Sequence, residues 1–205
     1  MYTLKSSIPN TTSKLVRELN WLPDQSQLEI LENNNFQCDC CGLVSRPHKQ
    51  VPSGFIEIAS FDDKELPLCS FCMQSQNLSR LVSGRINHGL IIYCPSLSQG
   101  QVSKLALYIY ASKLRGNGLS SAATNLLTNI NKSLIKPASK ILPILKSGEV
   151  QIFVDVYNNL SPDLLSRQES LFEDLKYLPS EELFKAQVAF WNKASLNNIS
   201  DLEWS

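Results

Sequence analysis

The sequence predicts an α+β protein: a small ββα core pinned by cysteines, followed by a mostly helical C-terminal region. Two observations point to this fold class. Two Cys-x-x-Cys pairs flank a short apolar stretch with turn residues, and from Ser98 onward the apolar residues mostly recur at helical spacing. The chain has 205 residues, of which 43% are hydrophobic, so it is long and apolar enough to bury a core.

Composition excludes some classes of protein and disfavours others. Lys and Arg number 19 and so do Asp and Glu, and this zero net charge argues against a dedicated nucleic-acid binder. The longest apolar run, Gly89–Cys94, is far below the roughly 20 residues of a membrane span, so no direct membrane insertion is expected. The start, Met1–Pro9, has no apolar signal region, which favours a reducing, cytoplasmic location.

The zero net charge conceals a segregation along the chain. Residues 1–65 carry a net −3, residues 66–148 carry +9 with no Asp or Glu, and residues 149–205 carry −6. Either the acidic C-terminal part folds against the basic middle, or the basic middle faces an acidic partner or nucleic acid. The charge pattern alone leaves both interpretations open.

Four of the six cysteines form a metal-binding pattern. Cys38 and Cys41 make the first pair, Cys69 and Cys72 make the second, and residues 42–68 separate them. Two such pairs, each expected on a tight turn, predict one Zn²⁺ held by four thiolates, with Gly42 supplying backbone freedom to the first turn. A shell of four cysteines leaves no position for substrate, so the predicted role is structural. Disulfides are disfavoured without a secretion signal.

The remaining cysteines are not expected to bind the metal. Cys40 lies inside the first pair but has the wrong spacing to its neighbours, and Cys94 ends an apolar run typical of a buried thiol. We therefore divide the chain into a zinc-binding module with N-terminal helices, residues 1–97, and a mostly helical region packed on it, residues 98–205. The two parts are expected to form one compact unit.

Local patterns predict the following elements. Helices are expected at 11–19, 24–32 and 70–82, with Asp24 as the N-cap of the second, and strands at 2–8, at 49–60 as a short hairpin, and at 89–93. In the C-terminal half, helices are expected at 103–115, 120–135, 137–145, 161–178 and 180–194, and an alternating strand at 150–157. The apolar stretch 105–114 is expected to be a core helix, with a binding groove as the alternative.

The order Cys-x-x-Cys, hairpin, Cys-x-x-Cys, helix resembles the zinc-stabilised HNH nuclease superfamily. In that family a hairpin strand ends in the general-base histidine, and a residue near the last cysteine helps to hold a catalytic metal. Ala59, Ser60 and Met73 occupy the matching positions here, and Ala and Met can neither accept a proton nor bind Mg²⁺ through oxygen. The two histidines, His48 and His88, lie elsewhere. The resemblance therefore implies an HNH-like scaffold without the chemistry.

A second resemblance covers most of the chain. The sequence is similar to the IcmJ/DotN family of the Dot/Icm type IVB secretion systems. The similar segments are Phe36–Leu43, Cys69–Gln74, the apolar run with its Pro-x-x-Ser-Gln continuation at Gly89–Gln99, and Asp174–Ser180 followed by Phe184, Lys185 and Trp191.

This second resemblance implies a function that composition does not give. Members are non-enzymatic subunits of the coupling complex that bind the cytoplasmic C-terminal tail of the coupling ATPase DotL, which also carries IcmS–IcmW and LvgA. The resemblance implies an adaptor that supports effector recruitment and is held at the inner membrane through its partner. A zinc-ribbon nucleic-acid-binding protein and a residual HNH endonuclease are the alternatives; the first predicts salt-sensitive DNA affinity, the second metal-dependent nicking.

Overall fold

The structure is a computed structural model that describes residues 23–61, 64–78, 89–116, 118–141 and 147–194. The expected strand at 2–8 and helix at 11–19 lie outside the described residues. The helix expected after Asp24 is confirmed as α1 (Gln25–Asn33). Asp24 accepts a hydrogen bond from the Gln27 backbone, and the Gln27 side chain accepts one from the Asp24 N–H, so this capping box defines where α1 begins.

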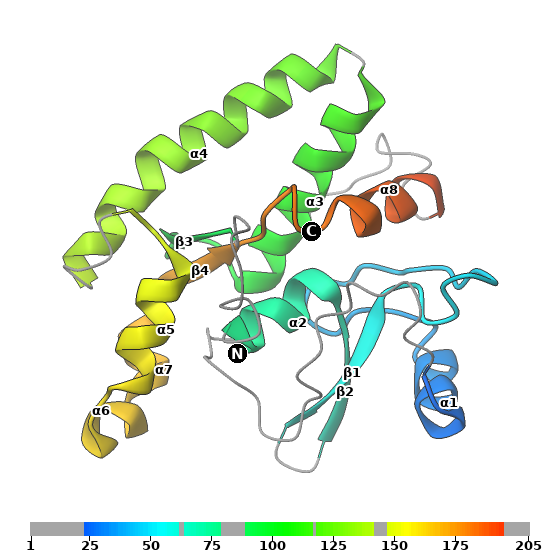
Figure 1. Cartoon of the computed structure of the whole chain (residues 1–205), viewed down its shortest axis with the longest axis horizontal. Helices are drawn as coiled ribbons and strands as arrows, with labels where there is room; N and C mark the ends of the chain where they lie inside the picture. Colours follow the sequence, from blue (N-terminus) through cyan, green and yellow to red (C-terminus); the bar gives the residue numbers. More distant parts are fainter. Residues whose placement is uncertain (1–22, 62–63, 79–88, 117, 142–146, 195–205) are drawn as a thin grey trace.

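After α1 the next regular elements in the chain form a two-stranded hairpin, β1 and β2 in Figure 1. Strand β1 (Ile56–Phe61) pairs antiparallel with β2 (Lys64–Cys69), and Ile56 lies opposite Cys69. The expectation of a hairpin within 49–60 is wrong, because 49–60 supplies only one strand and the isolated bridge between His48 and Val51. Pro67 is compatible with β2 because a strand of a two-stranded sheet has one unpaired edge.

Helix α2 (Ser70–Gln76) follows β2 directly and is shorter than the expected 70–82. Its seven residues are all buried, and Asn77 ends it. The buried Gln74 side chain donates to the carbonyl of Asn77 at 2.6 Å, which satisfies a backbone acceptor that the ended helix leaves open. Helix α2 therefore lies in the interior of the molecule and is not an amphipathic surface helix.

Two long helices form the upper part of the molecule (Figure 1). Helix α3 (Gln99–Arg115) begins four residues before the expected start, because Ser98 and Gln101 form a capping box. It ends at Gly116, whose left-handed backbone is favourable for glycine. Ten of the residues of α3 are buried, so the expectation of a core helix at 105–114 is confirmed.

Helix α4 (Leu119–Ile141) packs on α3 and on strand β3 (Leu90–Tyr93). The prediction of separate helices at 120–135 and 137–145 is wrong, because α4 continues through Pro137. Pro137 has no N–H to give to the carbonyl of Ser133, but Ser133 is exposed and water can satisfy that carbonyl. Packing of the apolar face of α4 outweighs the lost hydrogen bond.

The expected strand at 150–157 is also wrong, because these residues form helix α5 (Val150–Asn158). The apolar residues of 150–157 are nearly continuous. The sequence is therefore compatible with the two-residue period of a strand and with the 3.6-residue period of a helix. The buried side chains are Val150, Phe153 and Val154, at helical spacing. Phe153 stacks edge-on against Phe172 with ring centroids 5.0 Å apart, which ties α5 to the next segment.

The single helix expected at 161–178 is replaced by three elements, α6 (Pro162–Ser166), α7 (Gln168–Phe172) and strand β4 (Leu175–Leu178). Strand β4 pairs antiparallel with β3, which confirms the strand expected at 89–93. The helix expected at 180–194 is confirmed in part as α8 (Lys185–Ala194).

Trp191 of α8 fastens the C-terminal region to the segment before β1. It is fully buried, and its indole N–H donates to Ser45 Oγ and to the Gly54 carbonyl at 3.0 Å each. Its ring also lies edge-on against Phe55 and Phe71. The two hydrogen bonds join residues more than 130 positions apart along the sequence.

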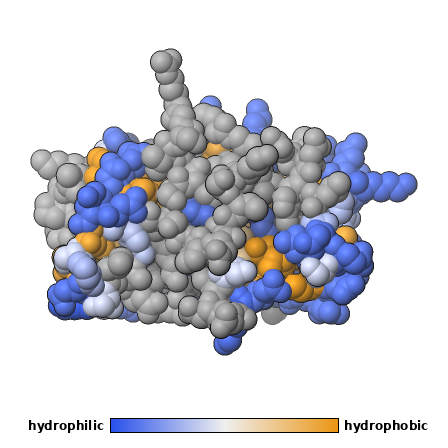
Figure 2. Space-filling view, turned by 60° about the horizontal axis from the view of Figure 1, so that its bottom comes forward, coloured by the Kyte–Doolittle hydropathy of each residue, from blue (hydrophilic) through white to orange (hydrophobic). Residues whose placement is uncertain are grey.

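The buried apolar residues form two clusters. The larger contains residues from both sides of position 97, and the smaller surrounds Phe153 and Tyr177. The division into 1–97 and 98–205 stays a prediction. Among the described residues that Figure 2 shows, the hydrophobic ones gather in a few areas bordered by hydrophilic side chains. Among the described helices, none is long and apolar enough to cross a membrane.

Candidate metal centre

The first cysteine pair lies on a tight turn between α1 and β1. The Cys38 N–H donates to the Leu43 carbonyl and the Gly42 N–H donates to the Cys38 carbonyl, both at 2.8 Å. Gly42 has φ +71°, a left-handed backbone conformation that favours glycine. Its predicted role of supplying backbone freedom to this turn is confirmed. The Asp39 N–H donates to the Pro67 carbonyl at 2.9 Å, which attaches the turn to β2.

The second pair differs from the expected turn. Cys69 is the last residue of β2 and the N-cap of α2, and Cys72 lies in the first turn of α2. The two side chains are therefore positioned by regular secondary structure on both sides of the strand-to-helix junction. Ser70 strengthens the junction, since its N–H and its hydroxyl both donate to the Phe55 carbonyl.

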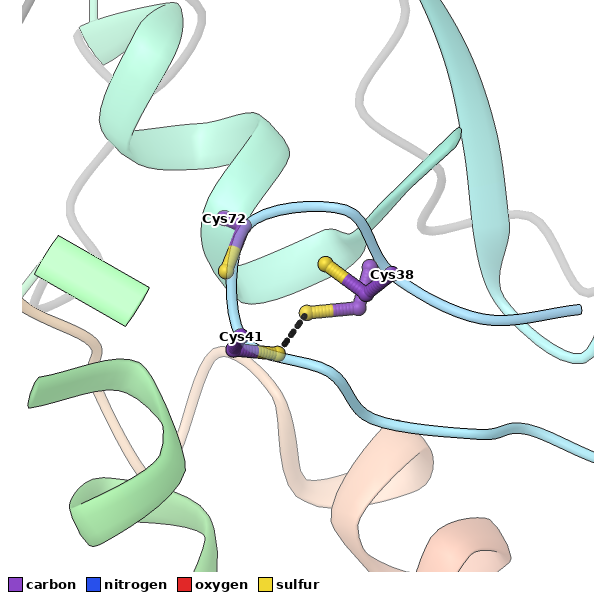
Figure 3. Close-up of side chains that lie close together, drawn as sticks. Cys38, Cys41 and Cys72 are labelled. Carbon is purple, nitrogen blue, oxygen red and sulfur yellow. Dashed lines mark hydrogen bonds between the residues drawn. The ribbon is translucent and has the colours of Figure 1, made fainter. Parts of the chain in front are cut away.

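The structure brings all four predicted ligands together. The Sγ atoms of Cys38, Cys41, Cys69 and Cys72 lie within 4.8 Å of one another, and those of Cys41 and Cys69 are 3.7 Å apart. Figure 3 shows Cys38, Cys41 and Cys72 side by side, with the Cys41–Cys69 contact dashed. A tetrahedral site with Zn–S bonds of about 2.3 Å has sulfur atoms ~3.8 Å apart. The cluster therefore fits a four-sulfur metal site.

Burial and mutual hydrogen bonding shape the acidity of these thiols. Burial raises the pKa of Cys69 and of Cys72 well above the ordinary value, and neighbouring thiols add to the shift. Burial also opposes ionisation of Cys38, but hydrogen bonds from the other three thiols hold its pKa well below the ordinary value. A divalent cation supplies the positive charge that four thiolates in one buried place require.

The other two described cysteines are not among the four whose Sγ atoms cluster. Cys40 is half-buried, and its thiol hydrogen bonds to Cys72. Cys94 is buried after β3, as expected of a packed thiol. Sequence reasoning missed one further neighbour of the cysteine turn, Gly100 in the first turn of α3. A Cβ at Gly100 would lie 2.0 Å from the Cys40 carbonyl oxygen, so α3 packs directly on the cysteine turn.

At the positions where the nuclease family places its catalytic groups, this chain has Ala59, Ser60 and Met73. Ala59 is fully buried in β1 and Met73 is buried in α2, while Ser60 is exposed. His48 lies in an exposed turn, where its Nδ1 accepts from the Gln50 N–H, and His88 lies outside the described residues.

The basic middle and the acidic C-terminal part meet at one described ion pair. Lys113 of α3 contacts the carboxylate of Glu181, and both side chains are partly exposed. The neighbouring Arg115 donates to the Asn192 side chain at 2.7 Å. Internal pairing therefore accounts for at least Lys113 among the basic side chains of the middle segment.

Comparison with known proteins adds a relative. The chain is 24% identical over 178 residues to the type 4 apparatus protein DotN of Legionella pneumophila strain Philadelphia 1. The aligned region covers 84% of this chain and 80% of DotN. The chain is a homologue of DotN. No model of a known protein family matches it. A continuous stretch of 84% of the chain omits about 33 residues, so the part related to DotN includes all four clustered cysteines wherever it begins.

The relation to DotN extends well beyond the cysteines. It covers four-fifths of the length of DotN, so it also takes in most of the helical region. Of the resemblances noted in the sequence, the relation to DotN is confirmed. The HNH-like character of the core stays a prediction, supported by the order of β1, β2 and α2 around the cysteines.

Proposed function

We propose that this chain is a non-catalytic adaptor subunit of a Dot/Icm type IV secretion apparatus. It binds the cytoplasmic C-terminal tail of the coupling ATPase DotL and meets IcmS–IcmW and LvgA through that tail. It acts on the cytoplasmic side of the inner membrane. The observation that carries this proposal is the similarity to DotN, a type 4 apparatus protein, over four-fifths of both chains.

We propose further that Cys38, Cys41, Cys69 and Cys72 hold one structural Zn²⁺. The spacing of the sulfur atoms fits a tetrahedral shell, and burial of three of the four side chains keeps water away from it. Bound Zn²⁺ would join the cysteine turn to the β2–α2 junction and so fix the surface that a partner meets. A rigid surface lowers the cost of ordering a flexible partner segment.

The absence of an enzymatic role is part of the proposal. It is supported by Ala59 and Met73, which are buried at the positions where the nuclease family places its acid–base and metal-binding groups. A closed four-sulfur shell offers a metal ion no open position for water or substrate.

Native mass spectrometry after co-expression with the tail of the coupling ATPase from the same genome tests these points together. The expected species has the mass of both chains plus one Zn²⁺. Co-expressed protein that carries Zn²⁺ but no tail would overturn the adaptor role and favour the nucleic-acid reading, to be checked by salt-dependent DNA binding.

A nicking assay separates the nuclease alternative. Purified protein is incubated with supercoiled DNA and Mg²⁺ or Mn²⁺, beside the His48→Ala and His88→Ala variants. The adaptor proposal expects no nicking by any of the three. Nicking by the parent protein that either variant abolishes would establish a residual endonuclease.

A further inference from the structure

One residue of the C-terminal helix contacts the chain on both sides of the cysteine cluster. Trp191 of α8 is fully buried, and its indole N–H donates to Ser45 Oγ and to the Gly54 carbonyl, both at 3.0 Å. Its ring lies edge-on against Phe71, with ring centroids 5.4 Å apart. Ser45 follows the first cysteine pair by four residues, and Phe71 lies inside the second pair. Trp191 therefore bridges the two segments that supply the four thiols.

The first of these segments is a loop that Ser45 closes. The Ser45 N–H donates to the Phe36 carbonyl at 2.9 Å, and Gln37 and Val44 form an antiparallel bridge just inside that contact. The residues between this bridge carry the first cysteine pair. The Ser45 hydroxyl also donates to the Gly54 carbonyl, so the indole of α8 bonds to both members of an existing pair. The base of the first cysteine loop is thus tied to α8.

The second segment is held to α8 through Phe55. Ser70, inside the second cysteine pair, donates its N–H and its hydroxyl to the Phe55 carbonyl. Phe55 has φ +65°, a left-handed conformation that a bulky residue adopts only where its surroundings hold it there. Two of the holding contacts come from α8, since the Phe55 ring lies edge-on against Phe190 and Trp191 with centroids 5.3 and 6.2 Å apart. Both residues inside the second cysteine pair therefore contact α8, Phe71 directly and Ser70 through Phe55.

This arrangement holds the two cysteine pairs toward each other through protein contacts. A metal site binds more tightly when neighbouring groups already hold its ligands in position, because less ordering has to accompany binding. Removing the indole N–H would leave the Ser45–Gly54 pair without its link to α8. The position of the first cysteine loop relative to the second pair would then be less defined.

We propose that Trp191 is a positioning residue for the metal centre. By holding Ser45, Gly54 and Phe71 together, it keeps the two cysteine pairs facing one point. Docking of α8 and occupancy of the metal site are therefore coupled, and because such coupling is reciprocal, each stabilises the other. The inference rests on the proposal that the four clustered cysteines hold one Zn²⁺.

Trp191→Phe and Tyr110→Phe give a matched test. Each variant keeps an aromatic ring in the same core cluster and removes one buried donor, but the Tyr110 hydroxyl donates to the Pro179 carbonyl, outside both cysteine segments. The purified proteins are compared for Zn²⁺ content and for the rate at which they release Zn²⁺ to a colorimetric chelator. Trp191→Phe is expected to release Zn²⁺ about tenfold faster than the parent, and Tyr110→Phe less than twofold faster.

Ser45→Ala reaches the same link from its other end without altering α8. The variant removes the acceptor of one indole hydrogen bond and leaves the bond to the Gly54 carbonyl. It is expected to release Zn²⁺ about threefold faster than the parent. If Trp191→Phe does not fold, the comparison of Ser45→Ala with Tyr110→Phe decides. Release from Ser45→Ala as slow as from Tyr110→Phe would then overturn the proposal.

The reciprocal effect is measured on the parent protein. Amide hydrogen exchange is followed with and without an excess of chelator in α8 (Lys185–Ala194) and in α5 (Val150–Asn158), whose buried residues belong to the other core cluster. Removal of Zn²⁺ is expected to accelerate exchange in α8 about tenfold and to leave α5 nearly unchanged. Exchange in α8 that does not respond, or that accelerates equally in both helices, would contradict a specific coupling of α8 to the site.

The outcomes separate the two proposals. If the purified parent holds no Zn²⁺ and takes up none, the proposed metal site fails and the role of Trp191 fails with it. If the parent holds one Zn²⁺ and folded Trp191→Phe releases it no faster than Tyr110→Phe, only the role of Trp191 fails.

Discussion

Gly100 of α3 lies so close to Cys40 that the carbonyl oxygen of Cys40 occupies the place where a side chain at Gly100 would begin. The two residues are 60 positions apart in the sequence. Through this contact the first turn of α3 rests on the backbone of the cysteine turn. The cysteine cluster and the long helices are therefore coupled by direct packing as well as by the shared core.

Gly100→Ala is expected to destabilise the protein. The new methyl group would lie 2.0 Å from the Cys40 carbonyl oxygen, and backbone atoms on both sides have to move. Overpacking of this kind costs about 2 kcal/mol, or about 4–8 °C in melting temperature for a chain of this size. Gly118→Ala is the control, because nothing lies within 4 Å of a Cβ there. Equal melting temperatures for the two variants would show that α3 shifts without cost.

Cys69→Ser is expected to lose bound Zn²⁺ and to unfold the module around the cysteines. Removing one thiolate opens the shell, and the energy of Zn²⁺ binding at such a site is folding energy. Zinc content and a melting curve check this. Cys94→Ser is the control, since Cys94 is buried but lies outside the cluster. A Cys69→Ser protein with full Zn²⁺ and an unchanged melting curve would remove Cys69 from the ligand set.

Gln99→Leu is expected to loosen strand β4. The buried Gln99 side chain donates to the Tyr177 carbonyl at 2.9 Å and accepts from the Tyr177 N–H at 2.8 Å, so it acts as a neighbouring strand for that residue. Leaving both backbone groups unpaired costs about 2 kcal/mol or more. Amide exchange at Tyr177 should accelerate in Gln99→Leu. Exposed Gln101→Ala, which removes only part of a cap, should leave that exchange rate nearly unchanged.

Tyr110→Phe is expected to lower stability by about 1–2 kcal/mol near neutral pH. The Tyr110 hydroxyl donates to the Pro179 carbonyl at 2.6 Å, and both residues are buried. Denaturant unfolding at pH 7 measures the difference. A variant as stable as the parent would mean that water replaces the hydroxyl at Pro179.

The same variant carries a pH signature. Burial, with a contribution from the charge of Glu181, raises the pKa of Tyr110 above its ordinary value. Below about pH 10 the side chain is protonated in both states, and its contribution is complete; above that, the unfolded chain loses the proton and the contribution falls. The stability gap between parent and Tyr110→Phe should therefore be constant below about pH 10 and narrow progressively above it. A constant gap would contradict burial as the cause.

The candidate site was predictable to an unusual degree because its information is local. Cys38 and Cys41 are joined by a turn that Gly42 permits, and Cys69 and Cys72 are one helical turn apart, so spacing alone indicates that each pair faces one point. The groove between α3, α4 and the connection from β4 to α8 was not predictable in the same way. Leu114, Asn131 and Val188 come from three helices, and nothing in their separate sequences indicates that they share a concave surface.

By itself, the sequence determined the four-cysteine set, the start of α1 at Asp24, the strand at Leu90–Tyr93 and the relation to DotN, because each depends on neighbours in the chain or on similarity along it. Only the tertiary structure decided the rest. Val150–Asn158 is a helix because Phe172 covers its buried side, and Leu175–Leu178 is a strand because β3 offers it an edge. Where a segment satisfies two periodicities, burial against distant residues selects between them.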